Sequence, residues 1–127
     1  MKQRAVWALT IAVGLFLLSG ILVPAAGQAS LAGSYRVAGQ NANGSTYAGT
    51  VQIIRSGDVY LMSWTIGGQT HTGIAIVDGS TLSSSWAIRG SSTHGIVVYR
   101  IEGSRLVGRW AQTGSTRLGR ETLTRVK

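Results

Sequence analysis

The sequence predicts an all-β fold: about eight antiparallel strands in an up-and-down meander, closed into a small barrel. Three observations support this fold class. Glycine is abundant, with 18 copies, whereas proline occurs once. Glycines recur at one register in four successive segments, and apolar and polar residues alternate within each segment, as in half-buried strands. A β-sandwich is the alternative that fits the same pattern.

An export signal is predicted ahead of this domain, over residues 1–29. Lys2 and Arg4 form a short positive start, residues 5–23 are almost wholly apolar, and Pro24 and several small residues follow. This order is typical of a signal peptide with cleavage near Ala29. We therefore expect the mature protein in the periplasm, on the cell surface or in the medium. An uncleaved anchor is the alternative, because the apolar run approaches the length of about 20 residues that spans a bilayer.

The rest of the chain, residues 30–127, is the length of a single domain. It contains no cysteine, so its stability must come from its core and its sheet. Removal of Lys2 and Arg4 reduces the twelve basic residues to ten, against four acidic residues, which leaves a formal charge of +6.

Four tandem units of hairpin length make up this domain, over residues 33–56, 57–78, 79–102 and 103–127. Each unit begins with glycine and carries two more glycines, eleven and sixteen residues further on. Units two to four also carry a tryptophan seven residues after the first glycine: Trp64, Trp86 and Trp110. Each unit is expected to form a strand, a turn and a returning strand, because glycine supplies the positive φ of tight hairpin turns.

Alternation within the strands predicts which side chains face inward. In the first strands of units two to four, the inward set is Tyr60, Met62, Trp64, Leu82, Ser84, Trp86, Leu106, Gly108 and Trp110. In the returning strands the inward set is Val51, Ile53, Ala75, Val77, Val97, Tyr99 and Ile101. Ile74, Ile76, Ile96 and Val98 then face outward, where they cover a sheet interface, a subunit contact or solvent.

The third glycine of each unit is expected to lie beneath the tryptophan of the same unit. Glycine within a strand commonly marks the close approach of a bulky neighbour. The resulting predicted pairs are Trp64 over Gly73, Trp86 over Gly95 and Trp110 over Gly119.

Two sets of residues are candidates for binding. The three tryptophans either line a pocket for a small ligand or fill one end of a narrow barrel as core. The second set is a predicted basic face formed by Arg36, Arg100, Arg105, Arg109, Arg117, Arg120 and Arg125. Such a face attracts an anionic polymer, a membrane surface or an extracellular protein, or it serves solubility alone. Export argues against nucleic acid as its partner.

No catalytic constellation is recognisable in the sequence. His71 and His94 lack the third ligand that a transition metal would need, and Asp58, Asp78 and Glu102 fall in predicted turns. We therefore expect no metal, no cofactor and no enzymatic activity. The leading functional hypothesis is an exported binding or structural module that contacts its partner through the basic face. The alternative is an avidin- or lipocalin-like barrel that holds a small ligand against Trp64, Trp86 and Trp110.

The stretch from Gly33 to Val51 has the pattern GxYxVxGxNxxGxxYxGxV. It resembles a group of small exported bacterial proteins, some of which carry the label "fibronectin-binding"; this resemblance implies export and a β-rich fold, and supplies no active site. A fainter likeness is to the avidin family, which also forms an eight-stranded meander with several tryptophans. The closing residues 121–127 look like the end of a streptavidin chain, although the spacing of the tryptophans differs.

Overall fold

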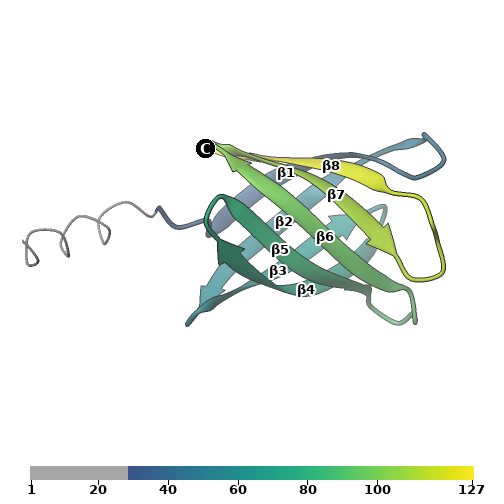
Figure 1. Ribbon diagram of the computed structural model, residues 1–127, viewed down its shortest axis with the longest axis horizontal. Coiled ribbons are helices and arrows are strands. Elements are labelled where there is room, and N and C mark those ends of the chain that lie inside the picture. Colours follow the sequence, from purple (N-terminus) through teal and green to yellow (C-terminus); the bar gives the residue numbers. More distant parts are fainter. Residues whose placement is uncertain (1–28) are drawn as a thin grey trace, which may run out of the picture. The chain divides into compact units, whose positions relative to one another are not determined.

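The computed structural model describes residues 29–127, so the predicted signal peptide lies outside the described residues except for Ala29. Residues 31–127 form one compact unit built only of strands and turns. Figure 1 shows its eight strands: β1 (Gly33–Gln40), β2 (Thr46–Ser56), β3 (Val59–Ile66), β4 (Gln69–Asp78), β5 (Thr81–Ile88), β6 (His94–Glu102), β7 (Arg105–Gln112) and β8 (Gly119–Arg125). Within the described range, no helix is long and apolar enough to cross a membrane.

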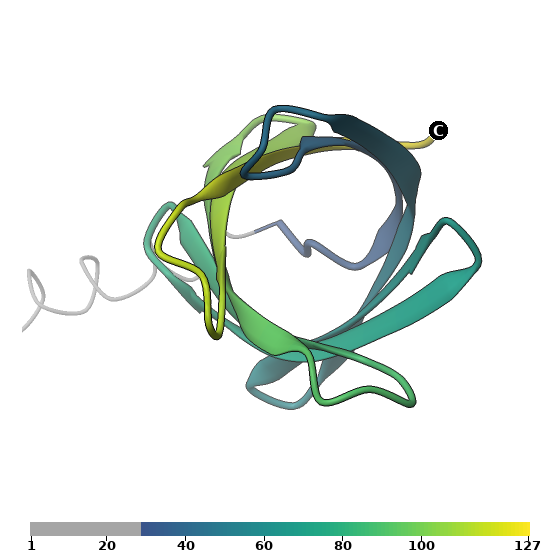
Figure 2. The same ribbon diagram turned by 90° about the vertical axis from the view of Figure 1, so that its right-hand side faces the viewer.

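The strands form a closed barrel in which every strand pairs antiparallel with its neighbours in the sequence, and β8 pairs with β1 (Figure 2). The predicted fold class is confirmed, and the barrel rather than the sandwich is correct. Each of the four repeat units forms one hairpin, as expected. Closure gives every strand two partners and removes the exposed edges that invite aggregation.

The predicted faces are also confirmed. The inward set forms the core, in which Val51, Ala75, Leu82 and Tyr99 are completely buried. The outer surface retains several exposed aliphatic residues: Ile54, Leu61, Ile74, Ile76, Ile96 and Val98. Some large inward side chains lie opposite glycine, as Tyr99 does opposite Gly108, whereas others meet a second apolar side chain, as Leu82 meets Tyr99.

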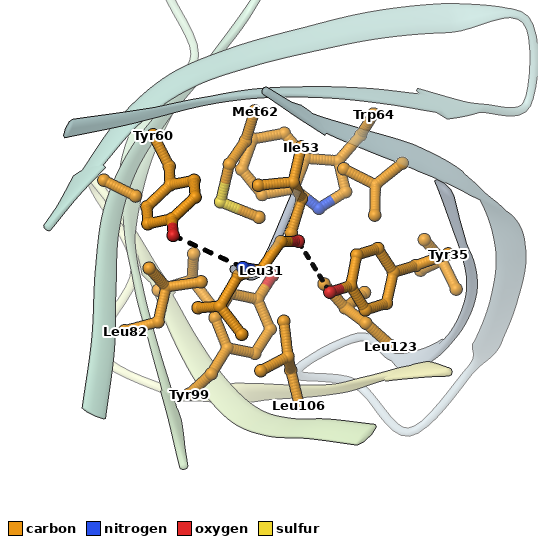
Figure 3. Close-up of a cluster of buried hydrophobic side chains, with 14 of the residues drawn as sticks. Leu31, Tyr35, Ile53, Tyr60, Met62, Trp64, Leu82, Tyr99, Leu106 and Leu123 are labelled. Carbon is orange, nitrogen blue, oxygen red and sulfur yellow. Dashed lines mark hydrogen bonds between the residues drawn. The ribbon is translucent and has the colours of Figure 1, made fainter. Parts of the chain in front are cut away.

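Leu31 closes one end of the barrel from within, a feature that the sequence did not reveal. Its side chain is buried in the core cluster (Figure 3). Its backbone N–H donates to the Tyr60 hydroxyl at 3.3 Å, and the Tyr35 hydroxyl donates to its carbonyl oxygen at 2.7 Å. The two tyrosines thus satisfy both polar backbone groups of a residue that lies inside the sheet.

The predicted contacts between tryptophans and glycines hold in two of the three units. Trp86 lies opposite Gly95 and Trp110 opposite Gly119, and a Cβ on either glycine would overlap the indole. The third prediction, Trp64 over Gly73, is wrong.

The reason is the length of the turn. Strands β3 and β4 are joined by Gly67 and Gly68 alone, both with positive φ, which places Trp64 opposite His71. The connections after β5 and β7 are longer, over residues 89–93 and 113–118, and they move the cross-strand partner two positions along the returning strand.

Candidate ligand-binding cavity

A partly open cavity of about 270 Å³ occupies one end of the barrel interior. Ile66, Ile88 and Gln112, which line it, are the last residues of β3, β5 and β7, whereas Leu31 lies before the start of β1, at the opposite end. The remaining lining residues are Asn41, Tyr47, Trp64, Gln69, His71, Trp86, Val97, Trp110 and Glu121. The barrel therefore has one end that Leu31 fills and one end that opens to solvent.

Three tryptophans form much of the wall, and the structure brings all three of the predicted residues together there. Trp64 and Trp86 are 3% and 8% exposed, and Trp110 is half-buried. The rings of Trp86 and Trp110 meet edge to face, with centroids 5.9 Å apart. The tryptophans thus pack as core on one side and line a cavity on the other, so both interpretations of the sequence describe part of the geometry.

A buried carboxylate lies against this aromatic wall. Glu121 of β8 is 6% exposed, and its side chain accepts three hydrogen bonds. The Tyr47 hydroxyl donates to Oε1 at 2.8 Å; Trp64 Nε1 and the Tyr99 hydroxyl donate to Oε2 at 3.0 Å and 2.5 Å. The only ion pairs between residues of the range 29–127 are those of Glu102, so Glu121 has no cationic partner there. Its burial is offset by hydrogen bonds alone.

The environment of Glu121 keeps its two tyrosine partners protonated. Burial, and then the negative charge of Glu121, raises the pKa of both Tyr47 and Tyr99 well above 10.0. A protonated hydroxyl can donate to the carboxylate, whereas a phenolate would repel it. The three side chains therefore act as one hydrogen-bonded unit at neutral pH.

Two other polar atoms of the wall are buried without a hydrogen-bond partner among the described residues: His71 Nδ1 and Trp110 Nε1. Trp110 partly offsets the rise in the pKa of the Tyr47 hydroxyl, although its Nε1 does not form a hydrogen bond of good geometry with that hydroxyl. Burial lowers the pKa of His71, so its imidazole is neutral at pH 7. Its ring lies 5.9 Å from that of Trp86.

Five of the seven predicted basic residues lie on the outer surface of neighbouring strands. Arg100, Arg109 and Arg120 border an outer groove of about 630 Å³ over β6, β7 and β8, and Arg109 lies directly opposite Arg120. Arg36 on β1 and Arg105 on β7 are also exposed. Arg100 and Arg105 both pair with Glu102, so part of their charge is balanced.

The other two basic residues lie elsewhere. Arg117 is exposed in the loop after β7. Arg125 lies over the ring of Tyr35 at 5.0 Å and donates to the carbonyl oxygen of Ala32 at 2.8 Å. It therefore stabilises the closed end of the barrel rather than facing the groove.

The two histidines are not equivalent. His71 lines the cavity, whereas His94 is exposed at the start of β6, where its Nδ1 lies 2.8 Å from the Ser92 carbonyl oxygen. Within residues 29–127, no three His, Asp or Glu side chains come close enough to hold a metal ion.

Sequence reasoning missed Glu121 as a site residue. The signal was present, because alternation along this strand places Gly119, Glu121 and Leu123 on one face and Arg120 and Thr122 on the other. A carboxylate at an inward-facing position of a strand is unusual enough to mark a buried polar site. Tyr47 was missed because its strand begins at an exposed turn, where alternation is less informative.

Comparison with known proteins adds evidence on the fold only. No family model and no curated protein matches the sequence. A solved structure described as "De novo design of a fluorescence-activating beta barrel" is similar, with a TM-score of 0.60 and 12% identity over 76% of this chain and 94% of that chain. At this identity the likeness shows a shared β-barrel fold. Fold and cavity together define the chain as a small up-and-down barrel with an internal aromatic pocket.

Proposed function

We propose that this protein is a non-enzymatic binding module that holds a small ligand in the open end of its barrel. The observation that carries this proposal is the cavity of about 270 Å³ with Trp64, Trp86 and Trp110 in its wall. Apolar walls with a few convergent polar groups are typical of ligand sites, which commonly enclose about 300–1,000 Å³. The cavity is smaller, so the ligand is smaller than a typical drug molecule.

The chemistry of the wall favours binding over catalysis. Glu121 is the only carboxylate in the lining, and it already accepts hydrogen bonds from Tyr47, Trp64 and Tyr99. A hydrolase that works with paired carboxylates needs a second acid across the site, and the lining contains none. A carboxylate held by three donors is better suited to fixing the wall and to orienting a ligand.

Tryptophan fluorescence tests this proposal directly. The purified protein is titrated with biotin, fatty acids and small aromatic compounds while its emission is followed. A ligand that enters the cavity should shift the emission, because it displaces water from the indoles. A matched variant, Arg109→Gln, changes the outer groove and should leave the titration unaltered. If no compound changes the emission, the cavity is not a ligand site for these classes.

A second candidate function rests on the outer groove. Arg109 and Arg120 are cross-strand neighbours, an arrangement of like charges that destabilises a sheet. An anionic polymer or surface bound across the groove would relieve this repulsion. Retention on heparin should fall as salt rises, and Arg109→Gln with Arg120→Gln should weaken it more than Arg89→Gln, a change of an exposed loop arginine. Equal retention of both variants would exclude the groove as the site.

Export remains a proposal based on residues 1–29. Mass spectrometry of the protein recovered outside the cytoplasm should give a chain that begins at Ser30. A chain that retains Met1 in the membrane fraction would support the uncleaved anchor instead.

A further inference from the structure

We propose that the cavity selects small organic cations, with the charged nitrogen packed against the tryptophan wall and directed toward Glu121. This inference rests on the proposed ligand-binding function and specifies the class of ligand. Three features of the described residues support it: the charge of the lining, the character of the wall and the free acceptor capacity of the carboxylate.

The lining carries one formal charge, and it is negative. Of its twelve residues, Glu121 is the only acid, and none is lysine or arginine. His71 contributes no positive charge at pH 7, because burial disfavours the protonated ring. The rest of the domain is strongly basic, yet within residues 29–127 none of these cations pairs with Glu121. A buried carboxylate is costly without a partner, so a bound cation would supply the missing charge.

The wall suits a cation better than an anion. Tryptophan and tyrosine rings attract a cation over their faces, most strongly where water is excluded. Trp64, Trp86, Trp110 and Tyr47 all contribute to the same cavity. An apolar ligand without charge would satisfy the rings but leave the hydrogen-bonded carboxylate without a counter-charge, and an anionic ligand would be repelled by it.

Glu121 can still accept a further hydrogen bond. Its Oε2 receives two donors, from Trp64 and Tyr99, whereas Oε1 receives one, from Tyr47. A carboxylate offers about four acceptor positions over its two oxygens. A protonated amine can therefore add an N–H donor at Oε1 without displacing the existing network.

Four exposed arginines lie toward the same end of the barrel and act in the opposite direction. Arg89 and Arg117 are on the loops after β5 and β7, and Arg109 and Arg120 are on the outer faces of β7 and β8. None of the four lines the cavity. Exposed charges of this kind are screened over about 8 Å at physiological ionic strength, whereas a buried carboxylate is screened much less. Close to Glu121, the field of its carboxylate should therefore dominate.

Pairs of isosteric probes test the inference by calorimetry on the purified protein. Choline is compared with 3,3-dimethylbutan-1-ol, and benzylammonium with benzyl alcohol; benzoate is the anionic control. Each cation should bind about tenfold or more tightly than its neutral partner, and benzoate should bind more weakly still. If the neutral partners bind as tightly as the cations, the inference is overturned while the ligand-binding function stands. If neither member of either pair binds, the inference is overturned, and the fluorescence titration then decides the function separately.

Three variants test whether Glu121 determines this preference for cations. Glu121→Gln should abolish the preference for the cations, whereas Glu102→Gln, a change of an exterior carboxylate, should retain it. Tyr47→Phe keeps the carboxylate and frees Oε1, so its preference for cations should be unchanged or larger. Unchanged selectivity in folded Glu121→Gln would overturn the assignment. If that variant does not fold, the comparison of isosteric pairs in the wild-type protein remains decisive.

Discussion

The indole of Trp110 lies directly over Gly119, its cross-strand neighbour in the hairpin of β7 and β8. A Cβ built on Gly119 would lie 2.5 Å from the indole Nε1 and closer still to Cε2 and Cζ2. The glycine therefore makes room for a ring that forms part of the cavity wall. This relationship connects the repeated glycine of the sequence to the shape of the candidate site.

Gly119→Ala should destabilise the barrel by about 1–3 kcal/mol, because the added methyl group forces the indole out of its position. Urea denaturation of four proteins measures the effect: wild type, Gly119→Ala, Trp110→Ala and the double variant. The cost of the alanine at position 119 should largely disappear when Trp110 is absent. An equal cost in both backgrounds would show that Gly119 is required by its backbone and not by the indole.

Gly95→Val should be more costly, at about 3 kcal/mol or more, the upper end of the overpacking range. Its Cβ would meet Trp86 Cζ2 at 2.7 Å and would also overlap the backbone carbonyl of Ala111, which no side-chain rotation can relieve. Ser92→Val is the matched control, because Ser92 is exposed in the same hairpin loop. Ser91 is less suitable, since its hydroxyl accepts from Thr93 N at 3.1 Å. Equal denaturation midpoints for the two variants would contradict the assigned register.

Tyr99→Phe should cost about 1.5–3 kcal/mol, the usual range for a hydrogen bond to a charged group. The substitution removes a completely buried donor from Oε2 of Glu121. Tyr35→Phe is a useful comparison, because Tyr35 donates to the neutral carbonyl of Leu31 and should cost only about 0.5–1.5 kcal/mol. Thermal or urea melts of both variants give the order. A smaller loss for Tyr99→Phe than for Tyr35→Phe would argue against a strong hydrogen bond between Tyr99 and Glu121.

The stability of the protein should fall above pH 10. Burial raises the pKa of Tyr35, Tyr47 and Tyr99 above 10.0 in the folded state, whereas the unfolded chain titrates near that value. Above pH 10 the unfolded state has therefore released protons that the folded state still holds, so the free energy of unfolding decreases with pH, by up to about 1.4 kcal/mol per pH unit for each tyrosine. Denaturation midpoints between neutral and strongly alkaline pH measure this slope. Tyr99→Phe should make it shallower, and an unchanged slope would exclude Tyr99 as a contributor.

Much of the fold was predictable because its signals are local. A glycine in each turn, a period of two within each strand and connections too short for a crossover leave few topologies besides an antiparallel meander. The inward positions of Leu82, Ser84 and Trp86 followed from the same alternation. The failure at Gly73 shows the limit of this reasoning: position within a repeat unit does not determine the cross-strand partner when turn lengths differ.

The site was predictable only in part. Trp64, Trp86 and Trp110 share one unit position, so an inward cluster was expected, but whether they leave a cavity depends on how neighbouring strands stagger around the barrel. Glu121 illustrates the remainder. Its donors come from β2, β3 and β6, and no sequence spacing relates Tyr47, Trp64 and Tyr99 to a residue on β8.

The sequence by itself determined that this chain forms four antiparallel hairpins with one apolar face each, because glycine turns and residue alternation act over a few neighbouring positions. Only the tertiary structure decided that the sheet closes through β1 and β8, that Leu31 fills one end, and that a carboxylate joins the tryptophans in the cavity wall at the other. These features depend on the register of each pair of strands, and the shifts between neighbouring strands add up around the eight-stranded barrel. A shift of two residues in one turn, as at Gly67 and Gly68, is enough to change which side chains meet.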